Sequence, residues 1–174
     1  MSIFAKKIPK SEIDVIYKQV QEIADILMTK SDNFFHSLFE NENEEDKSFR
    51  LFSAEVHALY ALSDIWKKNG VPIRTVIGRI ADIKELLADK HNYPYDVASN
   101  FYNSVKDRIE KDKGNYSTDD VAMAYANSFF DSTITLALED NGISFEEVGY
   151  DYLGIVCVSI AGAFIRAEKI AMSK

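Results

Sequence analysis

The chain has 174 residues, of which 47% are hydrophobic and 28% charged, so it is long and apolar enough to fold around its own core. Glycine and proline number only seven and three, which argues against a turn-rich β-sandwich or barrel. The net charge of −8 argues against a general binder of nucleic acids or anionic membranes. We expect a single domain over residues 1–174, with a flexible segment at 1–10.

Cysteine and targeting signals favour a cytoplasmic protein. Cys157 is the only cysteine, so an internal disulfide and a paired-cysteine zinc or redox site are excluded. No long apolar stretch follows the basic N-terminus, as a secretory signal would require. The longest uncharged apolar run, residues 152–165, is shorter than the roughly 20 residues that span a bilayer.

The first half of the chain shows helical periodicity and helix-ending signals. A first helix is predicted from Ser11, and its apolar stripe extends to Leu27. A short aromatic segment over residues 32–40 is the second candidate helix. A third helix is predicted over residues 45–68, because Asn69 and Gly70 follow it and glycine readily adopts the left-handed conformation that ends helices.

The second half predicts four more helices. One begins at Pro72, and the next covers residues 95–113 after the break at Pro94. A sixth runs from Ser117 or Thr118 to residues 141–142. Ser144 and Glu147 form a capping box for the seventh, which reaches almost to residue 174. The predicted fold is all-α, a single-domain bundle of six or seven mostly antiparallel helices.

The whole net negative charge of the chain comes from one segment, residues 114–165. Residues 114–165 contain eight acids and no Lys, Arg or His, whereas the other 122 residues carry 20 acids and 20 bases. We call residues 114–165 the base-free span. Helix N-termini favour some of these acids, but Glu139 and Asp140 lie at the opposite end of a predicted helix.

Three interpretations of the base-free span stay open. Bases elsewhere in the fold, such as Arg74, Arg79 or Arg108, pair with its acids, or the acids simply face water. In the third interpretation they face a basic protein, because tyrosines beside carboxylates suit a contact surface. The predicted partner-binding residues are Asp131, Glu139, Asp140, Glu147, Tyr150 and Asp151.

The third predicted helix carries a polar stripe at helical spacing, which consists of Arg50, Ser53, His57, Tyr60 and Asp64. A histidine beside proton carriers permits acid–base chemistry. Arg50 and His57 also have the spacing of HEPN-type helical ribonucleases, but Leu51 stands where that motif carries a polar residue, so no family is assigned. The alternative interpretation is a polar helix margin in which His57 bonds a neighbour.

The last predicted helix is apolar all round over residues 152–165, which is typical of a central, buried helix. It also contains glycines, each of which costs about 1 kcal/mol relative to alanine in a helix interior. Close packing in the core, a homodimer interface through this helix and a ligand pocket all explain them. The residues predicted to line such a pocket are Gly154, Cys157, Gly162 and Trp66.

Taken together, these patterns favour a non-enzymatic protein-binding domain, such as an inhibitor or immunity-type protein that covers a basic partner surface with its last two helices. The alternative is a small-molecule carrier or sensor with an apolar pocket beside the last helix. A third hypothesis is a nuclease-like helical enzyme that uses His57. We predict no catalytic residue, metal or cofactor, since no Glu-x-x-His pair, phosphate loop or nucleophile elbow is present.

Overall fold

A computed structural model describes residues 7–30, 37, 40–117 and 120–172, and every element in these ranges is a helix. The predicted all-α bundle is therefore confirmed, while most of the candidate helix at 32–40 lies outside the described residues. The elements are α1 (Lys10–Lys30), α3 (Glu44–Lys68), α4 (Ile73–His91), α5 (Tyr95–Lys113), α6 (Ala122–Phe129), the π-helical turn η2 (Phe130–Thr135), α7 (Leu136–Asp140), α8 (Phe145–Val148) and α9 (Tyr150–Met172).

Local signals set several helix ends as predicted. The cap of α3 was not predicted: the Asn43 side chain accepts a hydrogen bond from the backbone N–H of Asp46. Gly70 follows the same helix with a φ of 75°, which glycine adopts without strain. Pro94 precedes α5, and Ser144 and Glu147 form the predicted capping box of α8. These ends depend on residues next to one another in the chain, so the sequence reveals them.

Two predicted helices differ from the structure. The sixth starts at Ala122 instead of residue 117 or 118, and its middle is the π-helical turn η2. The seventh is interrupted at Gly149, whose φ of 96° is incompatible with a continuous α-helix. Gly149 therefore belongs to a turn between α8 and α9, and only Gly154 and Gly162 lie inside the last helix.

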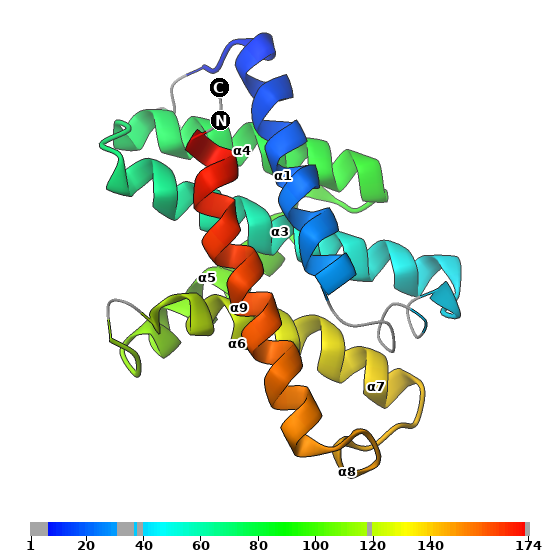
Figure 1. Cartoon of the computed structure of the whole chain (residues 1–174). Coiled ribbons are helices and arrows are strands. Elements are labelled where there is room, and N and C mark those ends of the chain that lie inside the picture. Colours follow the sequence, from blue (N-terminus) through cyan, green and yellow to red (C-terminus); the bar gives the residue numbers. More distant parts are fainter. Residues whose placement is uncertain (1–6, 31–36, 38–39, 118–119, 173–174) are drawn as a thin grey trace.

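Two helices cross a layer formed by the others. Figure 1 shows α1 and α9 side by side and antiparallel in front of α3, α4, α5 and α6, with the start of α1 and the end of α9 at one end. The α7–α8 turn and the start of α9 lie at the opposite end of the molecule. The part of the base-free span that forms the α7–α8 turn and the start of α9 therefore lies far from the start of α1 and the end of α9.

The central helix is α3, and the expectation that the last helix is buried all round is wrong. Every residue from 52 to 63 is buried, because α1, α4, α5, α6, η2 and α9 all pack against α3. By contrast, α9 buries one face and exposes the other, where Ile155 and Val158 are 67% and 62% exposed. The sequence did not predict this difference, because the buried α3 contains many polar residues and the exposed face of α9 contains apolar ones.

Candidate functional site

The polar stripe of α3 bonds the α6–η2 segment across the core. The hydroxyl of Ser53 lies 2.9 Å from that of Thr133, and Nε2 of His57 lies 2.9 Å from Oγ of Ser128. Ser128 and Thr133 are five residues apart, so in a regular α-helix they would point roughly 140° away from each other. The π-helical turn, which closes i to i+5 hydrogen bonds, allows both to face α3.

Burial gives His57 a structural role in this network. Its side chain has no exposed surface, and its Nδ1 lies 2.7 Å from the backbone carbonyl oxygen of Ser53. Nδ1–H donates to that carbonyl, which leaves Nε2 to accept from the Ser128 hydroxyl. Burial lowers the pKa of His57 to about 4, and the charge of Arg108 acts in the same direction. A neutral ring with both nitrogens bonded and no solvent contact matches the polar-margin interpretation of this stripe.

Arg50 occupies the start of the polar stripe as a buried cation. Its guanidinium donates to the carboxylates of Glu42, at 3.1 and 3.3 Å, and of Asp140. The side chains of Arg50 and Glu42 are both almost completely buried. Arg50 therefore ties the start of α3 to the end of α7, and Asp140 is engaged within the fold.

Tyr60 and Asp64 continue the stripe toward α5 and α6. Tyr60 donates to Glu110, while Asp64 accepts from both Lys113 and Tyr125. Burial by itself raises the pKa of the Asp64 carboxyl, but the bonds from Lys113 and Tyr125 outweigh it and lower the pKa below its ordinary value. All five residues of the stripe are thus bonded inside the bundle.

The structure separates the six predicted partner-binding residues into two groups. Asp140 bonds Arg50, and the Glu147 side chain accepts from the backbone N–H of Ser144. Asp131 belongs to η2, and burial raises the pKa of its carboxyl; the charge of Arg108 opposes this rise and that of Asp112 adds to it. Arg79, one of the bases expected to reach the span, bonds Glu12 instead. Glu139, Tyr150 and Asp151 are exposed and have no described ion pair, and the binding of a partner by the six residues stays a prediction.

The segment from the end of α7 to the start of α9 carries exposed acids and forms a shallow apolar hollow. The hollow has a volume of about 420 Å³ and is lined by Ile143, Glu147, Val148 and Tyr152. Tyr150 beside it is 65% exposed. We call the exposed residues Glu139, Glu146, Glu147, Tyr150 and Asp151, together with this hollow, the acidic corner. It combines negative charge with apolar surface, which is a composition suited to a basic amphipathic partner.

The residues predicted to line an apolar pocket are not gathered around one. Trp66 lies beneath the guanidinium of Arg79, at 4.9 Å from its ring centre. Cys157 bonds the side-chain oxygen of Asn127, at 3.2 Å. At Gly154 and Gly162 a Cβ atom would meet nothing within 4 Å, so neither glycine is required by close packing inside the described fold.

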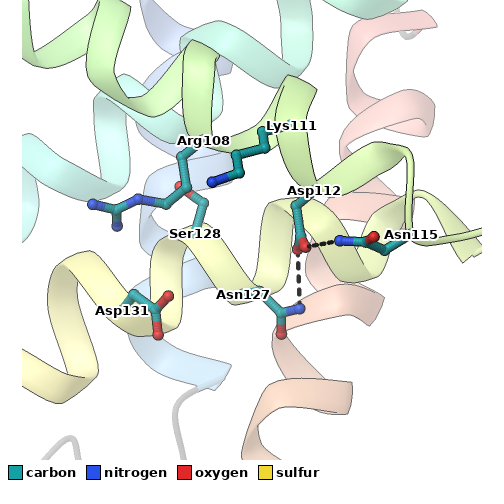
Figure 2. A pocket seen from close by; sticks show the side chains of 7 residues that line it. All are labelled: Arg108, Lys111, Asp112, Asn115, Asn127, Ser128 and Asp131. Carbon is teal, nitrogen blue, oxygen red and sulfur yellow. Dashed lines mark hydrogen bonds between the residues drawn. The ribbon is translucent and has the colours of Figure 1, made fainter.

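A second hollow, of about 320 Å³, lies between α5 and the α6–η2 segment (Figure 2). Two cations, Arg108 and Lys111, and two acids, Asp112 and Asp131, border it. Asn127 donates to Asp112 at 3.2 Å, and the guanidinium of Arg108 donates to Ser132 at 2.7 Å. Sequence patterns did not indicate this hollow, because α5 and η2 meet only in the folded chain. Asn115 and Ser128 complete its lining.

The described residues meet neither the requirements of a metal centre nor those of a membrane-spanning helix. No group of three or more His, Cys, Asp or Glu side chains is placed there to hold a metal ion. No helix in the described ranges is both long and apolar enough to cross a bilayer. Comparison with known protein families, curated proteins and solved structures finds no match.

Proposed function

We propose that the chain is a protein-binding domain that uses the acidic corner to bind a basic partner, in the manner of an inhibitor or immunity-type protein. The observation that carries the proposal is the apolar hollow that Glu147 helps to line, inside a span that has acids and no bases. An apolar side chain of the partner fills the hollow, and lysines or arginines around it face Glu139, Glu146 and Asp151.

Charge and exposure make this corner a stronger candidate than the rest of the base-free span. Glu139 and Glu146 are exposed, and no described ion pair neutralises either of them. Their combined field accelerates encounter with a basic protein and weakens as salt is added. Tyr150, exposed beside the hollow, supplies a rigid amphipathic ring of the kind enriched at interface centres.

The test is a charge reversal restricted to the corner. The variant Glu139→Lys with Glu146→Lys leaves Asp140 and Glu147 in their structural bonds. The matched control, Glu85→Lys with Asp89→Lys, makes the same charge change on exposed positions of α4. Binding is measured by calorimetry against a synthetic amphipathic peptide of lysine and leucine, and by pull-down from cell extract at low and high salt.

We expect the corner variant to lose the peptide and any salt-sensitive basic protein that the wild type and the α4 control retain. Tyr150→Ala is expected to weaken binding without altering its salt dependence, since this change removes no charge. Equal binding by the corner variant and the α4 control would refute the proposal, because net charge alone would then explain any attraction.

A second candidate function is the binding of a small polar molecule in the hollow between α5 and η2. The specific observation is the π-helical turn that borders it, since π turns are rare and occur frequently at functional sites. Cations and acids side by side suit a ligand that carries both charges, such as an amino acid (Figure 2). Native mass spectrometry of freshly purified protein tests this: a retained mass that Arg108→Met with Lys111→Met abolishes supports it, and a bare chain contradicts it.

A further inference from the structure

The exposed face of α9 carries an apolar seam with a regular repeat. Large apolar side chains at Ile155, Val158 and Ile165 are 67%, 62% and 58% exposed, and Met172 continues the row. The complete row, which we call the outer seam, is Asp151, Ile155, Val158, Gly162, Ile165, Lys169 and Met172. Its members alternate four and three residues apart, which is the spacing by which one helix packs along another in a coiled coil.

The outer seam is also self-complementary when it is paired with an antiparallel copy. Pairs of its residues are centred on residue 160, so that Ile155 faces Ile165 and Val158 faces Gly162. The same register places Asp151 opposite Lys169, and no described ion pair engages either of them within the chain. A parallel pairing would instead put like charges together at each end.

No packing contact within the described fold explains why α9 has glycine at position 162, where alanine would make the helix more stable. A Cβ at this position would meet nothing within 4 Å, yet glycine destabilises a helix interior by about 1 kcal/mol relative to alanine. In the antiparallel pairing, the missing side chain leaves a hole for the branched side chain of Val158 from the other copy. The exposed Val158, the open space at Gly162 and the charges of Asp151 and Lys169 thus all indicate the same antiparallel register.

We infer that the chain forms a twofold homodimer in which the outer seams of two α9 helices pack antiparallel, with Val158 of each copy seated on Gly162 of the other. This interface does not depend on the proposed binding of a basic partner, because it lies along α9 and shares only Asp151 with the acidic corner. A twofold contact of this kind closes on itself, so assembly stops at two copies.

Sedimentation and light scattering of the full chain over a range of concentrations test the inference. The wild type is expected at twice the monomer mass of 19.7 kDa. Val158→Glu and Gly162→Leu, at positions open to solvent in the monomer, are each expected to give monomers with an unchanged helical circular-dichroism spectrum. The control Ile73→Glu, at an equally exposed apolar position on α4, is expected to remain dimeric.

A charge exchange tests the register. Asp151→Lys alone and Lys169→Asp alone are each expected to raise the dissociation constant about tenfold, because both replace two attractive pairs with repulsive ones. The double variant restores opposite charges and is expected to return to within about threefold of the wild type. A double variant as weak as the singles would overturn the antiparallel register.

Two further results would overturn the dimer itself. One is a wild-type chain that stays at the monomer mass at every concentration, and the other is a dimer that Val158→Glu leaves intact. A flotation assay with vesicles of neutral phosphatidylcholine tests whether the outer seam binds lipid instead of a second copy. A monomeric chain that floats with these vesicles, and ceases to do so in Val158→Glu, would assign the outer seam to a lipid surface instead of a second copy.

Discussion

Nε2 of His57 lies 2.9 Å from Oγ of Ser128, so the centre of α3 is joined to α6 by a hydrogen bond between two fully buried side chains. The neighbouring contact between Ser53 and Thr133 repeats this arrangement one turn away. A buried polar pair stabilises only when both members are satisfied, and a lost partner costs about 1–3 kcal/mol. The helices α3, α6 and η2 are consequently held in one specific register.

The stability of the fold should depend on pH through His57. Because the pKa of this histidine falls from 6.5 in the unfolded chain to about 4 in the folded one, the unfolded state binds more protons between these values. The contribution of the neutral His57 to the free energy of unfolding is therefore fully present above about pH 6.5. It is lost as the pH falls toward 4, by at most roughly 1.4 kcal/mol per pH unit. Urea unfolding of wild type and His57→Gln from pH 7 to pH 5 measures this loss, and the difference between them should shrink toward pH 5. Parallel curves would contradict the assignment.

Removing one hydroxyl of the Ser53–Thr133 pair should lower the free energy of unfolding by more than the loss of a single small group would suggest, because the other hydroxyl loses its hydrogen-bond partner. Ser53→Ala leaves the buried Thr133 hydroxyl without this partner, and we expect the free energy of unfolding to fall by about 1–3 kcal/mol. Adding Thr133→Val should cost little more, since both polar groups are then gone. Ser104→Ala, at an exposed position of α5, is the control and should change stability by less than about 0.5 kcal/mol. Strictly additive losses in a double-mutant cycle would show that the two hydroxyls do not interact.

Arg50 should be among the residues least tolerant of substitution. Arg50→Met strands the buried Glu42 carboxylate, and breaking a buried ion pair from one side costs about 3–5 kcal/mol. Combining it with Glu42→Gln should recover part of the loss, because the stranded charge is removed. Urea unfolding of the single and double variants measures this, and a mild single variant would be the contrary result. Asp140→Asn should cost less, since the Asp140 side chain is half exposed.

Two glycines near the start of α9 should respond to alanine in opposite directions. Gly149→Ala places a side chain at a φ of 96° and should destabilise the fold by about 1–3 kcal/mol. Gly154→Ala puts a methyl group into open space inside a helix and should stabilise it by about 0.5–1 kcal/mol. Thermal unfolding at one protein concentration distinguishes them, and a shift of the same sign in both would contradict the break between α8 and α9.

The sequence by itself determined the helical class and most helix ends, because periodicity, caps, Gly70 and Pro94 act between near neighbours in the chain. It also located the net charge in the base-free span. The tertiary structure alone decided which acids stay exposed, since the cation that engages Asp140 is Arg50, 90 residues earlier in the chain. It also decided which helix is central. Burial is set by the number of helices packed around an element, so the polar α3 became the core and the apolar α9 kept an open face.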